Sequence, residues 1–147
     1  MSGVKIPALL IGLVLYSIAI ASDDAPQQVR QDLMKDVRQA AKPVGNMLRE
    51  KEAFNAETMM SSLMVFAKVA DQYGAQFPEG SESGFETEAA PAIWEDREGF
   101  DMALMEFAEA TKIAIESGPQ TLEDARTTVS PIFKTCKGCH DNYRIED

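Results

Sequence analysis

The chain has 147 residues, with 14 Lys and Arg against 24 Asp and Glu, a net charge of −10 and 45% apolar residues. This length and apolar fraction are typical of one globular domain with its own core, which argues against a disordered chain and a repeat array. The acidic balance also argues against nucleic acid as a partner, because binding to the phosphate backbone needs clustered Lys and Arg.

The first 21 residues differ in composition from the rest of the chain. Lys5 precedes an apolar run from Ile6 to Ala21, which ends in two small residues separated by one position. This pattern predicts a signal peptide over residues 1–21, cleaved after Ala21, and a mature periplasmic domain over residues 22–147. The alternative is a retained membrane anchor. The run spans only about 16 residues and contains Pro7, whereas a spanning helix needs roughly 20.

Apolar residues recur at helical spacing in four later segments, and no strand pattern competes with them. The first segment is predicted to run from about Pro26 to Glu50, although Pro43 inside it should kink or break the helix. The second runs from about Glu57 to Tyr73. The third begins near Pro91 and carries apolar residues as far as Ala114. The fourth begins behind Thr121, an expected N-cap, and reaches Tyr143.

The connections between these segments predict how the helices are arranged. Residues 51–56 and 117–120 are short connections, whereas residues 76–90 form a longer loop with Pro, Gly and Ser among acidic residues. Short connections favour antiparallel neighbours. The sequence therefore predicts an all-α fold, an antiparallel up-down-up-down four-helix bundle in which residues 76–90 join the second and third helices.

A chemical motif lies near the end of the fourth predicted helix. Cys136 and Cys139 are the only cysteines and are followed at once by His140, the only histidine. The run Cys-Lys-Gly-Cys-His is the attachment signature of a c-type haem. Two thiols can add to the two vinyl groups of one porphyrin edge, and on a helix Cys136 and His140 share a face. The motif predicts one haem c, bound covalently through Cys136 and Cys139 near the C-terminal helix.

Three other interpretations use the same residues. A thioredoxin-like redox pair would need an alternating β/α chain, and the segments here are helical. A zinc site would have to complete Cys136, Cys139 and His140 with a carboxylate such as Asp141, giving a zinc-stabilised helical protein. A structural disulfide would leave the neighbouring His unexplained. A further interpretation keeps the haem as a purely structural group in a binding or sensing module.

The other face of the haem must be supplied from earlier in the chain, because only seven residues follow His140 and no methionine follows Met105. Met34 and Met47, both on the first predicted helix, are the candidates. The other upstream methionines of the mature chain are expected to be core or partly exposed packing residues on the second and third helices: Met59, Met60, Met64, Met102 and Met105.

These residues together resemble the class II cytochromes c, the group that contains cytochrome c′ and its low-spin relatives. The C-terminal run from Cys136 to Arg144 is similar to the family's last helix, and residues 30–34, Arg-Gln-Asp-Leu-Met, resemble its Arg-Gln-x-x-(Met/Leu/Tyr/Phe) segment. Further similarities lie in Phe54–Ala56, Phe77–Gly80 and Pro91–Trp94. The resemblance covers the whole mature chain.

The resemblance implies a set of haem contacts. Cys136 and Cys139 would form thioether bonds, and His140 would be the proximal axial ligand of the iron. The remaining residues that the resemblance places at the haem edge, the propionates or the proximal imidazole are Arg30, Gln31, Thr87, Glu88 and Arg144. Since Arg30 lies about one turn from Met34, its guanidinium could reach a propionate while the thioether points at the ring.

Met34 separates two expected functions. In the low-spin relatives a methionine at this position is the distal axial ligand of an electron carrier, whereas in cytochrome c′ the residue shields an empty sixth position that binds nitric oxide or carbon monoxide. We expect one-electron transfer, with gas binding as the alternative. An enzyme of the acid/base kind is not expected, since the lone His is committed to iron. The acidic chain suggests a basic redox partner, and the resemblance implies a homodimer through the first two helices.

Overall fold

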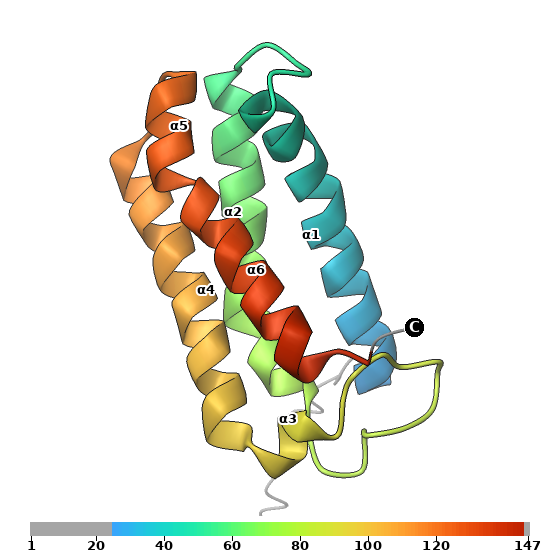
Figure 1. Cartoon of the computed structure of the whole chain (residues 1–147). Helices are drawn as coiled ribbons and strands as arrows, with labels where there is room; N and C mark the ends of the chain where they lie inside the picture. Colours follow the sequence, from blue (N-terminus) through green and yellow to red (C-terminus); the bar gives the residue numbers. More distant parts are fainter. Residues whose placement is uncertain (1–24, 146–147) are drawn as a thin grey trace, which may run out of the picture.

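The computed structural model describes residues 25–145, which form a bundle of helices (Figure 1). α1 packs against α2, α2 against α4, and α4 against α6, while α5 and α6 follow one another as the last arm of the bundle. The predicted all-α, antiparallel four-helix bundle is confirmed. In chain order the elements are α1 (Pro26–Leu48), α2 (Ala56–Tyr73), the 3-10 helix η1 (Gly74–Gln76), α3 (Ala92–Glu95), α4 (Arg97–Ser117), α5 (Leu122–Thr128) and α6 (Ser130–Tyr143).

Local side chains explain where these helices begin and end. Asn55 caps α2 by accepting a hydrogen bond from the Thr58 amide at 2.8 Å. Thr121 and Asp124 form a reciprocal capping box at the start of α5. Such caps satisfy amides that have no partner inside the helix. Gly118 ends α4 with φ +55°, a left-handed conformation that glycine adopts without steric cost.

α1 continues through Pro43 to Leu48, so the expected break at Pro43 is wrong. A proline at position 43 cannot donate to the carbonyl of Gln39, one turn earlier. Gln39 is exposed, which leaves that carbonyl accessible to water. Val44 and Met47 on the next turn are buried at 0% and 2% exposure. Their packing holds the end of α1 in helical conformation despite the lost hydrogen bond.

Two of the predicted helices are each divided in two. The segment that begins near Pro91 is interrupted at Asp96, whose side chain starts α4 by accepting from the Gly99 amide at 3.1 Å. The last segment is interrupted at Val129, between α5 and α6. Pro131 stands in the first turn of α6, where its missing amide hydrogen is not needed. The break at Asp96 therefore gives α4 a start capped by a side chain, whereas α6 begins after Val129 without a side-chain cap.

The buried side chains form two apolar clusters. The smaller cluster contains Phe77, Ile93 and Phe100, beside the long loop. The larger one fills the end of the bundle near α5 and contains Ala40, Val44, Met47, Met59, Leu63, Phe66, Phe107, Ala114, Ala125, Val129 and Ile132.

The long loop, the start of α1 and the end of α6 lie at the same end of the bundle (Figure 1). Ala89 and Arg144 form an isolated antiparallel bridge that joins the loop to the residue after α6. No helix within residues 25–145 has the length and apolar character needed to cross a membrane. The predicted signal peptide over residues 1–21 lies outside the described residues.

Candidate haem site

A cavity of about 590 Å³ lies between α1 and α6 and is closed on its other sides by α2, α4 and the long loop. This volume falls within the range of small-molecule and cofactor sites, roughly 300–1,000 Å³. The cavity wall contains the nine residues that the motif and the family resemblance predict as haem contacts: Arg30, Gln31, Met34, Thr87, Glu88, Cys136, Cys139, His140 and Arg144. Its apolar part comes mainly from Val37, Val69, Ile93, Phe100, Leu104, Phe107 and Phe133.

α6 presents the two cysteines to this cavity from successive turns. Both are partly buried, and neither forms a disulfide. Burial raises the pKa of Cys136, and burial together with the neighbouring Cys136 raises the pKa of Cys139 to about 11. Both side chains are therefore neutral thiols at neutral pH. A zinc ion would first have to displace their protons.

His140 follows on the same helix and also borders the cavity. Burial lowers its pKa, and the positive charge of Arg144 lowers it further. Arg144 is itself paired with the long loop, since its Nε lies 2.8 Å from Oε2 of Glu88. The imidazole is thus favoured in the neutral form, which is the form that can bind a metal ion.

Arg30 is the most deeply buried charged residue of the cavity wall, with 3% exposure. Its Nη2 donates to the Ser81 carbonyl at 2.8 Å and to Thr87 Oγ1 at 3.3 Å. Its Nη1 donates to Ser81 Oγ at 3.2 Å and to the Gln76 carbonyl at 3.3 Å. The guanidinium therefore holds the long loop against α1.

The Arg30 charge forms no ion pair within the described residues 25–145. Its Nε is buried without a hydrogen bond, and among residues 25–145 no carboxylate pairs with it. Its guanidinium carbon lies 4.7 Å from the centre of the Phe77 ring and 5.7 Å from that of Trp94. Burial lowers the Arg30 pKa. A buried cation with a free N–H suits an anionic group of a bound molecule, because burying an unpaired charge is unfavourable.

The two glutamines of α1 make further contacts with the loop. Gln31 Nε2 donates to the Phe85 carbonyl at 2.7 Å, and Gln27 Nε2 donates to the Ser83 carbonyl at 2.8 Å. Gln27 is 7% exposed and lines the cavity, yet sequence reasoning did not select it. Its position one turn before Gln31, on the face that carries Arg30, is the signal that could have indicated it.

The two methionine candidates of α1 separate in the structure. Met34 is partly buried and lines the cavity. Met47 is 2% exposed and belongs to the larger apolar cluster, and its sulfur accepts a hydrogen bond from the Asn55 amide at 3.2 Å. Met47 is therefore a core residue, and the expectation that it could meet the haem is wrong.

Two tyrosines of the wall were not predicted as site residues. Tyr73 ends α2, and burial, reinforced by the nearby Cys139, raises its pKa to about 12. Tyr143 ends α6, three residues after His140. In the sequence both stand on the apolar faces of amphipathic helices, where they cannot be distinguished from core residues.

The residues of the cavity fit a haem c. Two neutral thiols and an imidazole share one face of α6, apolar side chains line the space where a porphyrin would lie, and Arg30 offers an unpaired buried N–H to a carboxylate. The same residues are less suitable as ligands of a zinc ion. Within the described part of the chain, no three His, Cys, Asp or Glu side chains converge in a way that could hold a metal ion.

Comparison with known proteins agrees with this geometry. A family model described as cytochrome C′ matches residues 25–144. Cytochrome c′ of Rhodopseudomonas palustris is 31% identical over 144 residues, 95% of each chain. Cytochrome c-556 of Agrobacterium tumefaciens is 26% identical over 117 residues, which cover 80% of this chain and 94% of that protein.

Comparison with solved structures also points to cytochrome c′. The solved structure of cytochrome c′ from Rhodopseudomonas palustris superposes with a TM-score of 0.80 at 27% identity, covering 84% of this chain and 98% of that one. Because the family model spans nearly all described residues and the relatives align over most of their length, the chain belongs to the cytochrome c′ family of haem c proteins.

Proposed function

We propose that this chain is an exported cytochrome that transfers one electron through a haem c held between α1 and α6. The observation that carries the proposal is the composition of one cavity wall. It brings the thiols of Cys136 and Cys139 and the His140 imidazole together with the Met34 thioether from the facing helix. A haem c bound there would supply an iron that alternates between the ferric and ferrous states.

In this proposal each element of the wall has a separate task. Cys136 and Cys139 would fix the group to α6 through thioether bonds, and His140 would supply a nitrogen ligand to the iron. The apolar side chains of α2 and α4 would keep water away from the iron, which would favour the ferrous state and limit solvent rearrangement on electron transfer. Arg30 offers its unpaired Nε–H to a carboxylate of the bound group.

We assign Met34 as the distal axial ligand. Two features support this assignment: Met34 lines the cavity from α1, and a thioether is a competent soft ligand that raises the reduction potential. The second candidate function is the binding of nitric oxide or carbon monoxide at an open sixth position. It is favoured by the 31% identity to a protein named cytochrome c′. In that case Met34 only shields the position.

The spin state of the iron distinguishes these two functions. If Met34 is a ligand, the ferric protein is low-spin by electron paramagnetic resonance and the ferrous protein resists carbon monoxide. Met34→Ala should then become high-spin and bind the gas. The matched control is Met64→Ala, because Met64 is 56% exposed on α2 and should leave the spectrum unchanged. A high-spin wild-type protein at neutral pH would contradict electron transfer with Met34 ligation and support gas binding.

The sequence also supports a proposal for the location and partners of the protein. Export requires that residues 1–21 act as a signal peptide cleaved after Ala21, leaving residues 22–147 in the periplasm. The net charge of −10 suggests a basic redox partner whose association slows as salt is added. We also propose a homodimer through α1 and α2. A solved cytochrome c′ of the same fold undergoes ligand-controlled dimer dissociation.

A further inference from the structure

The last turn of α6, which carries His140, is tied to the long loop by its backbone. The Tyr143 carbonyl accepts a hydrogen bond from the Ala90 amide at 3.0 Å, and the Ile145 amide donates to the Glu88 carbonyl at 2.8 Å. These bonds fix the end of the helix on the loop side. On the side that faces α4, the same turn makes another contact, through a side chain.

The Tyr143 side chain makes that other contact. Its hydroxyl donates to Oδ2 of Asp96 at 3.0 Å, across 47 positions of the sequence. Its ring packs edge-on against Phe100, with ring centres 5.4 Å apart and an interplanar angle of 77°. The same ring lines the cavity, three residues after His140. A side chain held at both its ring and its hydroxyl restrains rotation of the turn that bears it.

Asp96 uses its two carboxylate oxygens for different helices. Oδ1 accepts from the Gly99 amide at 3.1 Å and caps α4, while Oδ2 accepts from Tyr143. An N-cap alone needs only one acceptor oxygen, which Ser or Asn can supply about as well as Asp. The carboxylate therefore has a second oxygen free to hold α6.

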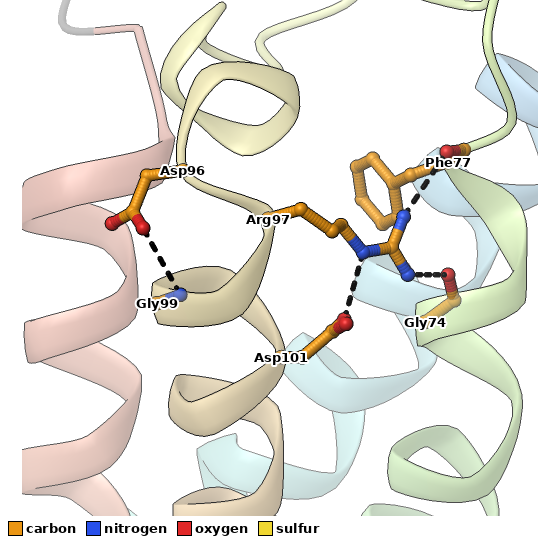
Figure 2. A network of polar contacts seen from close by, with 6 residues as sticks. All are labelled: Gly74, Phe77, Asp96, Arg97, Gly99 and Asp101. Carbon is orange, nitrogen blue, oxygen red and sulfur yellow. Dashed lines mark hydrogen bonds and ion pairs between the residues drawn. The ribbon is translucent and has the colours of Figure 1, made fainter.

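The start of α4, next to Asp96, is held in place by the contacts of Arg97. Figure 2 shows Arg97 pointing away from Asp96, to the opposite side of the chain. Its Nη2 donates to the Gly74 carbonyl at 3.1 Å, its Nη1 to the Phe77 carbonyl at 3.3 Å, and its Nε lies 2.9 Å from Asp101 Oδ1. Arg97 thus anchors the first turn of α4 to the end of α2.

Gly99 leaves the space that the contact needs. A Cβ atom at this position would lie 2.5 Å from the Tyr143 hydroxyl and closer still to the Asp96 carboxylate, so one of the two groups would have to move. A side chain at position 99 would therefore displace the Asp96 carboxylate or the Tyr143 hydroxyl from this hydrogen bond.

We propose that Tyr143 is a positioning residue for His140. By bonding to Asp96 over Gly99, the tyrosine sets the rotation of the last turn of α6 and with it the orientation of the imidazole toward the iron. This inference rests on the proposed axial role of His140. One function is shared by the Tyr143 hydroxyl, the Asp96 carboxylate and the missing side chain of Gly99, namely to orient the His140 imidazole.

The test compares haem-loaded wild-type protein with Tyr143→Phe and Asp96→Ser by paramagnetic NMR of the ferric state. Tyr143→Phe keeps the ring and removes only the hydroxyl. Asp96→Ser keeps a cap for α4, but one short hydroxyl cannot also hold Tyr143. We expect both variants to displace the resonances of the His140 ring and the haem methyl groups in the same direction. The double variant should show the same displacement as either single variant, because the two residues act through one bond.

Two further variants complete the test. Gly99→Ala should reproduce the displacement while leaving both partners chemically intact. Asn142→Ala is the matched control, because Asn142 lies in the same turn, is exposed, and its side chain donates to the Gly138 carbonyl of its own helix at 2.9 Å. Its spectrum should equal that of wild type.

Particular results would overturn the inference. These are a Tyr143→Phe spectrum identical to wild type, or displacements in the double variant that are the sum of those of the single variants. A wild-type spectrum without the signals of an iron-bound imidazole would instead overturn the proposed function, and the inference with it. The two failures are therefore distinguishable.

Discussion

Replacement of Arg30 should destabilise the protein by releasing the long loop. The guanidinium makes four hydrogen bonds to the loop and the end of η1, of which the 2.8 Å bond to the Ser81 carbonyl is the shortest. A good hydrogen bond from a charged donor contributes about 1.5–3 kcal/mol, and longer bonds contribute less. The cost of burying the charge offsets part of this gain. We expect Arg30→Ala to lower the free energy of unfolding by about 2–4 kcal/mol.

Urea unfolding of the haem-loaded protein, followed by far-UV circular dichroism, measures this loss. For a domain of this size the change corresponds to a fall in Tm of roughly 10 °C. Arg30→Lys should recover only part of the loss, because a single ammonium cannot span the acceptors that a planar guanidinium reaches. Arg49→Ala is the control, since Arg49 is exposed at the end of α1. A loss for Arg30→Ala that equals the loss for Arg49→Ala would refute the reasoning.

Three further predictions concern the thiols, the core and export. In haem-free protein, burial raises the pKa of the Cys139 thiol to about 11, so the native state holds this proton more tightly than the unfolded chain does. The free energy of unfolding should therefore fall as the pH rises from about 8.5 toward 11. Urea titrations across this window should show a steeper loss for wild type than for Cys139→Ser, and parallel curves would contradict the shift. Leu63→Ala, at a site with 0% exposure, should cost about 2–5 kcal/mol in the same assay, and a cost under about 1 kcal/mol would contradict the core assignment. N-terminal sequencing of the native protein should begin at Ser22, and recovery of intact Met1 in membranes would contradict export.

The bundle could be predicted because its signal is local and repeated. Apolar spacing identified the helices, and Gly118 with Pro119 marked a stop that the structure keeps. The division at Asp96 was missed because its capping bond to Gly99 carries the same sequence signal as an acidic residue inside a helix. Pro43 was misjudged as a break because its effect depends on whether the carbonyl one turn earlier reaches water, which the sequence does not state.

The residues of the site could be predicted from the sequence, but the hydrogen bonds that join them to distant segments could not. The haem motif is local, so Cys136, Cys139 and His140 follow from their spacing alone. The contacts of Arg30 with Ser81 and Thr87 join positions 51 and 57 residues apart, and nothing in either segment specifies them. The bond between Tyr143 and Asp96 has the same long-range character. Such pairs can be identified only once the fold has brought the two distant segments together.

Peptide mapping of the native protein by mass spectrometry tests whether α6 carries a covalently bound haem c. We expect the peptide containing Cys136 and Cys139 to retain one haem after denaturation, and neither thiol to react with an alkylating reagent. The intact mass of the native protein should equal the mass of the chain that begins at Ser22 plus the mass of one haem. Two freely alkylated cysteines in a protein without haem would contradict the account.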